Sequence, residues 1–273
     1  MELLTSTALS LGILVLLFGP LERAFPARPG QPILRPELRI DLWFFLGQYL
    51  LFAGIAVAVL SAFVDTVEPL LPSLLLETSA AAPLWVRGLI AIALGDVLVY
   101  WFHRACHHYP LLWRFHAVHH STEHLDWLAA HREHPADGIL TQVVINLPAI
   151  MLGLPFAAVG GLVVFRGLWA IFIHSNVRLP LGPLRVLLGA PELHHWHHAR
   201  VITRHNFANL GPWVDLLFGT YHCPEGPENY PLGLTEPWPR GYLAQLLHPL
   251  GIRRRSADGR SSSSLDEPAE RAP

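Results

Sequence analysis

The chain contains no lysine, only two cysteines and little charge, and these scarcities exclude several classes of protein. Cys106 and Cys223 are too few for a disulfide framework or for a four-thiolate zinc or iron–sulfur site, so a bound metal must be held mainly by nitrogen. Charged residues make up 15% of the 273 residues and apolar residues 52%. An average soluble domain carries about 25% charged residues. The composition therefore disfavours a disordered chain and an ordinary cytosolic globule.

Basic runs and several well-known catalytic motifs are also missing. The net charge is −2, all 19 basic residues are arginine, and no basic cluster occurs before the C-terminal tail, so a nucleic-acid partner is not expected. The sequence contains no H-E-x-x-H, G-x-S-x-G or G-x-x-x-x-G-K-[ST] pattern. The usual routes to hydrolysis and nucleotide binding therefore lack support.

Four apolar stretches predict an integral membrane protein rather than a globule with buried helices. Residues 3–18 lack a positive segment before them and a cleavage site after them, which predicts a retained anchor. Residues 42–64 and 84–102 are each long enough to cross a bilayer, which takes about 20 helical residues. Residues 139–173 are too long for one span, and Pro148, Pro155 and the Gly160–Gly161 pair predict a break into two helices that form a hairpin.

The distribution of arginine predicts the orientation in the membrane, because cytoplasmic loops are enriched in basic residues. The second loop, 61–83, has three acidic residues and no basic one. The first loop has four arginines, Arg23, Arg28, Arg35 and Arg39. This places the first loop and, after the third span, the histidine-rich region on the cytoplasmic side. The tail, 253–273, begins with three arginines, is rich in serine and acidic residues, and is predicted to be disordered on the same side.

The 17 histidines are concentrated after residue 102, and eight of them form three clusters with helical spacing. Side chains three or four residues apart share a helix face. Pro191 suits the first turn of the helix that carries the last cluster. The clusters are His103 and His107; His116, His119 and His120; and His194, His197 and His198. One zinc site needs three or four protein ligands, so eight imidazoles suffice for two metal ions with open positions.

Other residues are weaker candidates. His174, at the end of the hairpin, is a possible ninth ligand. His134 is either a ligand or a residue that positions a ligand. Asp96 lies seven residues before His103 on the same helix face, where it could accept the spare N–H of a metal-bound imidazole. Cys106 is expected on a different face. The remaining histidines are expected at the surface: His108, His124, His131, His195, His205, His222 and His248.

The segment His120-Ser-Thr-Glu-His124 matches the H-x-x-E-H pattern of some zinc peptidases. That interpretation would leave the other histidine clusters without a role. It is therefore disfavoured.

From Asp96 to Tyr221 the sequence resembles the fatty acid hydroxylase/sterol desaturase superfamily of integral-membrane diiron oxygenases. The residues that carry the resemblance are the boxes His103-x3-His107-His108, His116-x2-His119-His120 and His194-x2-His197-His198, the segments His134-Pro-Ala-Asp137-Gly and His174-Ser-Asn, the pair Asn206-Phe207, and the ending Trp213-Val-Asp-Leu-Leu-Phe-Gly-Thr-Tyr221. Two departures, the inserted Val214 and Ala208 in place of a glycine, touch no expected ligand.

The resemblance implies a centre of two iron ions, with O2 as co-substrate and a lipid from the bilayer as substrate. The resemblance implies that the eight clustered histidines and His174 are metal ligands, and that His134 is a possible one. It also places Asp137 and Asn206 around these ligands, in addition to Asp96. No catalytic residue beyond the metal ligands is implied. Imidazole suits zinc as well as iron, and spacing does not separate the two metals. The product would be an alcohol or an alkene.

Electrons must come from a separate ferredoxin, cytochrome or reductase, because the chain has no G-x-G-x-x-G fingerprint, cysteine cluster or evident haem domain. Trp113, Trp127 and Arg200 are candidates for docking this donor, or for anchoring the protein at the membrane interface.

The expected architecture is all-α, with about three spans, a helical hairpin and a cytoplasmic cap that carries the histidine boxes. Residues 1–83 are expected to form a transmembrane anchor region, 84–222 the catalytic domain, and 223–273 a C-terminal segment. Two other functions remain open, a zinc-dependent membrane hydrolase and a non-enzymatic metal transporter or store. A transporter is expected to place its ligands at mid-depth in the membrane, whereas these histidines lie past the helix ends.

Overall fold

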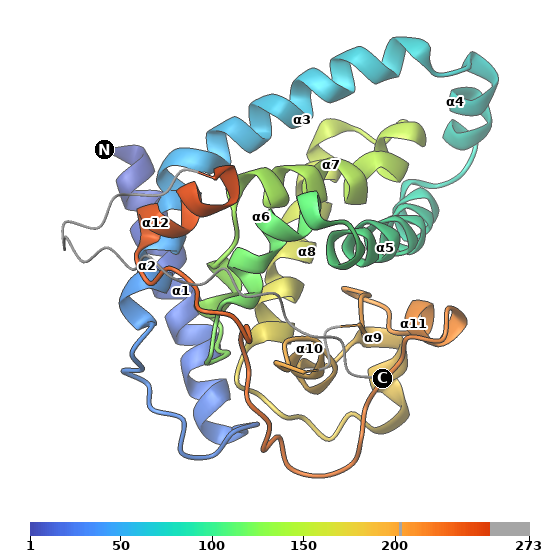
Figure 1. Ribbon diagram of the computed structural model, residues 1–273. Helices are drawn as coiled ribbons and strands as arrows, with labels where there is room; N and C mark the ends of the chain where they lie inside the picture. Colours follow the sequence, from blue (N-terminus) through green and yellow to red (C-terminus); the bar gives the residue numbers. More distant parts are fainter. Residues whose placement is uncertain (202–203, 252–273) are drawn as a thin grey trace, which may run out of the picture.

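The protein is all-α, as the sequence predicts (Figure 1). The computed structural model describes residues 1–201 and 204–251. Within these residues the only extended pairings are two isolated bridges, Pro26 with Val177 and Ala199 with Leu232. The predicted disordered tail, 253–273, lies outside the described residues. The α-helices are α1 Glu2–Ala24, α2 Leu38–Gly47, α3 Ala53–Val67, α4 Ser73–Ala80, α5 Leu84–His108, α6 Pro110–His120, α7 Pro135–Met151, α8 Phe156–His174, α9 Arg185–Leu188, α10 Pro191–His197, α11 Trp213–Leu217 and α12 Tyr242–Leu247.

Four helical stretches are long and apolar enough to cross a membrane. They are α1, the continuous stretch Leu38–Leu70 that contains α2 and α3, α5, and α8. Only 6% of the most apolar part of Leu38–Leu70 is buried inside the protein, and side chains such as Ile55 and Val57 are exposed. Apolar surface of this extent is unfavourable in water and is accommodated by lipid. The chain is therefore a membrane protein, and three of these stretches contain the three single spans expected from hydropathy.

The long apolar region after residue 135 folds as two helices, α7 and α8, as predicted, and of the expected helix breakers Pro155 lies at the break. The helices are separated by a turn at residues 152–155, where Gly153 has a φ of +61° and Pro155 precedes the first turn of α8. Pro148 lies inside the last turn of α7, and Gly160 and Gly161 lie inside α8. The glycine pair was thus wrongly expected to interrupt a helix, because glycine only weakens a helix that packing supports.

The N-terminal helices pack against the part of the chain that carries the histidines. Leu14 and Phe18 of α1 share a buried cluster with Phe45 of α2, Leu128 and Ile171 of α8. In Figure 1, α1 and α2 accordingly lie beside α8.

The first loop is tied to the same side of the molecule. The Arg28 backbone N–H donates to Asn176 Oδ1 at 2.8 Å, and Gln31 Nε2 donates to the Leu125 carbonyl at 2.8 Å. These bonds place the arginine-rich loop on the same side as the histidine-bearing loops.

Candidate metal centre

Nine histidines from four helices converge in two adjacent groups. Helices α5, α6, α8 and α10, which bring them together, meet near the middle of Figure 1. The first group is His103, His107, His116, His120 and His197, and the second is His119, His174, His194 and His198. In each group one nitrogen per ring lies within 4.8 Å of those of the others. The structure thus brings together the eight clustered histidines and His174, the candidate ninth ligand.

The two groups do not follow the three sequence clusters, because α6 and α10 each contribute to both. His116 and His120, four residues apart on α6, share the first group, while His119 points to the second. His194 of α10 and His198, which directly follows the helix, share the second group, while His197 of α10 belongs to the first. Residues four apart are nearly in line on a helix, whereas a residue one position before the second of them is rotated by about 100°. Each of these two helices therefore presents ligands on two neighbouring faces.

In the second group, hydrogen bonds fix which nitrogen of two rings is unprotonated. His119 Nδ1 lies 3.1 Å from the Arg132 carbonyl oxygen, and His174 Nδ1 lies 2.6 Å from the Ala170 carbonyl oxygen. A carbonyl oxygen only accepts, so in the neutral rings both Nδ1 atoms carry the proton and both Nε2 atoms carry a lone pair. These two Nε2 atoms are 3.0 Å apart. Two facing lone pairs cannot bond to each other, whereas a cation between them would bind both.

The first group shows the same arrangement. His103 Nδ1 donates to the Phe207 carbonyl at 2.8 Å, and His116 Nδ1 donates to Asp137 Oδ2 at 2.8 Å, while the two Nε2 atoms are 3.0 Å apart. The buried Nε2 atoms of His107, His120 and His197 have no hydrogen-bond partner among the described residues. Buried nitrogen atoms without partners are costly. Both groups therefore fit metal ions, which would satisfy these atoms.

The spacing and protonation of the rings also suit metal ions. Metal–imidazole bonds of about 2.0–2.1 Å place neighbouring ligand atoms about 3 Å apart, and Nε2 atoms of His194 and His198 lie 3.1 Å from each other. Burial, reinforced by the neighbouring imidazoles, lowers the pKa of His119, His120, His194 and His198 well below the usual value, and that of His197 to about 3. The rings are thus neutral at physiological pH, as metal ligands must be.

Asp137 supports the first group from outside it. Its Oδ2 atom accepts from His116 Nδ1, and Cys106 Sγ lies 3.9 Å from its Oδ1 atom. A carboxylate that accepts the N–H of a ligating imidazole fixes the ring orientation and makes the other nitrogen more basic. The sequence predicted this contact for Asp96 and placed Asp137 only in the surroundings of the ligands. Cys106 does not join the five histidines, although it lies within reach of His116 and Asp137.

Replacing Asp137 by asparagine is expected to weaken metal binding without abolishing it. The amide can keep a hydrogen bond to His116 but loses the negative charge, and such changes typically cost about 10–100-fold in metal affinity or activity. The measurement is competition for iron and zinc with a chelator of known affinity. Asp65→Asn, an exposed residue of α3, serves as the control. Unchanged affinity in Asp137→Asn would contradict the supporting role.

The chain after the third box is folded so that it supports His103. Asp215 accepts hydrogen bonds from the backbone N–H groups of Phe207 and Ala208, at 2.8 and 2.9 Å, and thereby positions the Phe207 carbonyl against His103. Asn206, with a φ of +56°, donates from Nδ2 to the Leu193 and His222 carbonyls. Asn206 therefore holds this loop against α10, and its side-chain hydrogen bonds go to backbone groups rather than to a ring of either group.

The structure places two other candidates outside the groups. Asp96 pairs with Arg166 of α8, with Oδ1 and Nη1 3.3 Å apart, and does not accept from His103. His134 begins α7, where its Nδ1 accepts from the Ala136 backbone N–H and its Nε2 lies 3.2 Å from the Leu246 carbonyl. Both ring nitrogens of His134 are therefore occupied by backbone groups.

Two histidines expected at the surface are buried, so that prediction was wrong for them. His195 is fully buried, with Nδ1 2.6 Å from Glu228 Oε2 and Nε2 3.0 Å from the Ser175 carbonyl. His131 packs its ring against Phe45. No local pattern could reveal these roles, since Glu228 is 33 residues from His195.

The H-x-x-E-H pattern does not form a metal site. His124 Nδ1 lies 2.7 Å from Glu37 Oε2, and Glu123 lies 3.4 Å from Arg200. Of its residues only His120 belongs to either group.

Comparisons with known proteins identify a family and relatives that the chain resembles. Residues 88–220 match the family model described as fatty acid hydroxylase. The chain is 34% identical to ornithine lipid hydroxylase of Rhizobium tropici, with 63% of this chain and 53% of that protein covered. It is 30% identical to alkylglycerol monooxygenase of Homo sapiens, with 56% of this chain and 33% of that protein covered. It is 27% identical to lathosterol oxidase of Mus musculus, with 56% of this chain and 53% of that protein covered.

The matched region spans about half or less of the length of these relatives. No solved structure matches the chain. The family match begins in α5 and ends at Thr220, and it contains all nine histidines of the two groups. Residues 88–220 are therefore similar to the fatty acid hydroxylase family, and the relatives of the chain include lipid hydroxylases, monooxygenases and sterol desaturases.

Proposed function

We propose that the protein is a membrane-bound lipid oxygenase that holds two iron ions in the two histidine groups and uses O2 to hydroxylate a lipid C–H bond. The observation that carries the proposal is the pair of adjacent groups whose Nε2 lone pairs converge without another partner. The match to the fatty acid hydroxylase family supports iron and O2 chemistry at this site.

The protein's own residues hold and orient the metals. The five-histidine group would bind one ion and the four-histidine group the other, and imidazole donors suit iron. Iron bound there supplies O2 activation, which an unactivated C–H bond requires. Asp137 and the carbonyls of Phe207, Arg132 and Ala170 keep Nδ1 protonated in four of the rings, which leaves their Nε2 atoms able to hold a metal ion; these rings are His116, His103, His119 and His174.

The substrate we propose is a lipid that enters from the bilayer. The relatives are named for lipid substrates, namely an ornithine lipid, alkylglycerol and lathosterol. Hydroxylases, monooxygenases and sterol desaturases all occur among them. Desaturation is thus the second candidate reaction, and it would need the same two metal ions.

We further propose that the histidine groups face the cytoplasm and receive electrons from a separate ferredoxin, cytochrome or reductase. The contacts of the first loop with Asn176 and Leu125 support placing its arginines on the same side as the groups. For the donor's docking surface, Trp113 and Arg200 are the better candidates, because Trp127 packs in the cluster formed by α1, α2 and α8.

The proposed function is tested by lipid mass spectrometry of cells with and without the protein, grown under 18O2. A product that contains labelled oxygen is expected for hydroxylation, and a product that has lost two hydrogens would indicate desaturation. Cells producing the His119→Ala/His197→Ala double variant serve as the inactive control.

The zinc hydrolase and the metal transporter make different predictions. Lipid turnover that persists without O2 in the zinc-loaded protein would favour the hydrolase. Metal uptake into vesicles without any lipid product would favour the transporter. Either result would contradict the oxygenase proposal.

A further inference from the structure

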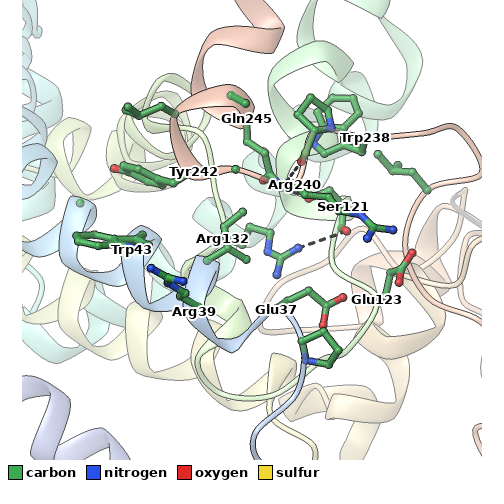
Figure 2. A pocket seen from close by; sticks show the side chains of 18 of the residues that line it. Glu37, Arg39, Trp43, Ser121, Glu123, Arg132, Trp238, Arg240, Tyr242 and Gln245 are labelled. Carbon is green, nitrogen blue, oxygen red and sulfur yellow. Dashed lines mark hydrogen bonds between the residues drawn. The ribbon is translucent and has the colours of Figure 1, made fainter. Parts of the chain in front are cut away.

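A large cavity lies beside the second histidine box, outside both histidine groups. Its volume is about 1390 Å³, and its walls are α2, the loop that begins at Ser121, and the segment from Leu234 through the start of α12. Figure 2 shows Arg132 in the middle of the lining, with Trp43 and Arg39 of α2 on one side and Ser121 on the other. None of the nine converging histidines lines the cavity. The cavity is therefore distinct from the two histidine groups.

The lining changes from polar to apolar along α2. Glu37 and Arg39 stand at the start of the helix, and Trp43, Leu50 and Leu51 follow toward the membrane-spanning part of the same helical stretch. At 1.5 Å per helical residue this wall is about 21 Å long. A ligand that follows the wall would have a polar head and a long apolar chain, that is, the shape of a lipid.

The lining offers donors for the polar head. Arg132 is only 2% exposed, and its Nη2 atom has no hydrogen-bond partner among the described residues. Its other nitrogens are used, Nε by Asp41 and Nη1 by the Ser121 carbonyl. Because arginine only donates hydrogen bonds, the group that satisfies Nη2 must be an acceptor.

The other charges around the cavity favour an acidic acceptor. Glu37 and Glu123 are engaged by His124 and Arg200 respectively. Arg39 and Arg240 are exposed at the cavity and form no ion pair with the described residues. Two arginines are thus available besides the Arg132 Nη2 atom, against one further carboxylate, the exposed Glu236.

We infer that the cavity binds a lipid whose head group carries an acidic oxygen group, a phosphate or a carboxylate. The acidic group accepts a hydrogen bond from Arg132 Nη2, Arg39 and Arg240 contribute charge at the rim, and the acyl chain lies along α2. Guanidinium groups are well suited to these anions, because their planar donors match two oxygens at once.

Arg132 also connects this cavity to the metal groups. Its carbonyl accepts from His119, so the residue that contacts the head group also positions a ligand of the four-histidine group. The identification of the bound lipid as the substrate rests on the proposed oxygenase function. Binding itself does not depend on turnover and can be measured separately.

The test is the binding of radiolabelled hexadecyl phosphate to the full chain in a neutral detergent at fixed micelle concentration. Arg132→Lys keeps a charge beside Asp41 but loses the forked donors, and Arg39→Gln/Arg240→Gln removes the rim charges. Each is expected to weaken binding at least tenfold. Arg114→Gln, an exposed arginine of α6 outside the cavity, is the matched control and should bind as the native protein does.

Competing ligands show whether the cavity binds an anionic lipid or a free anion. Hexadecylphosphocholine should compete well, whereas hexadecanol, hexadecyltrimethylammonium and inorganic phosphate should compete at least tenfold less well. Competition by inorganic phosphate as strong as that of hexadecyl phosphate would show a simple anion site and overturn the inference. Equal binding by the native protein and both arginine variants, with metal content unchanged, would also overturn it.

A turnover measurement separates this inference from the proposed function. If the bound lipid is the substrate, Arg132→Lys should raise KM more than it lowers kcat, because the residue would act on binding. Arginine-dependent binding without any O2-dependent product would refute the oxygenase and leave the lipid site standing. An O2-dependent product without arginine-dependent binding would refute the lipid site and leave the oxygenase standing.

Discussion

Replacing His119 or His197 by alanine is expected to remove one metal ion each and to abolish lipid oxidation. His119 belongs to the four-histidine group and His197 to the five-histidine group, so each variant damages a different ion site. The native protein should bind two iron ions, each single variant about one, and the double variant none. Activity should fall by at least about 10³-fold in every case, since both ions are needed for the hard chemistry. Iron per chain is measured by elemental analysis beside the rate of product formation.

His108→Ala is the matched control for these variants. His108 follows His107 directly but is exposed and belongs to neither group. This variant should keep two ions and native activity. If His119→Ala or His197→Ala retained native turnover, the proposed centre would be refuted. If each single variant lost both ions, the two groups would form one cooperative site rather than two separable ones.

The sequence predicted the membership of this centre better than its division into groups. Helical spacing identified the eight clustered histidines, because side chains three or four residues apart lie on one side of a helix. It could not show that His119 and His197 turn to a different group from their cluster neighbours. That division depends on how α6 and α10 cross α5 and α8, which is a property of tertiary packing.

The residues that support the centre could be predicted only in part. The resemblance indicated Asp137, which does contact His116, and His134, which lies outside both groups, while helical spacing suggested Asp96 beside His103. Asp96 instead pairs with Arg166, 70 residues away, and so has a partner that helix periodicity cannot reveal.

The membrane helices were predictable because they depend on the apolar composition of the segment and not on its partners. Long apolar runs are expelled from water whatever their partners are, so hydropathy located α1, α5 and the Leu38–Leu70 stretch. The break between α7 and α8 was predicted from three features, and only Pro155 lies at it. Pro148 lies inside α7, and Gly160 and Gly161 lie inside α8.

Replacing Asp41 by alanine is expected to cause the largest loss of stability. Asp41 lies on α2, is fully buried, and forms ion pairs with Arg35 and Arg132, both of them 2% exposed. Arg35 in turn binds Asp126 through two hydrogen bonds of 2.6 Å. Breaking a buried pair leaves an uncompensated charge and costs about 3–5 kcal/mol. Thermal unfolding in detergent measures the loss, with exposed Asp65→Ala on α3 as the control.

The same variant tests whether α2 and the metal centre are coupled. Asp41 holds Arg132, and the Arg132 carbonyl holds His119, so the loss of Asp41 should weaken the four-histidine group before the five-histidine group. We therefore expect folded Asp41→Ala protein, isolated below its lowered unfolding temperature, to bind closer to one iron ion than to two. An unfolding temperature equal to that of the control would show that Arg35 and Asp126 suffice without Asp41. A normal unfolding temperature with one ion lost would assign Asp41 to the centre alone. A lowered temperature with both ions retained would confine its role to the fold.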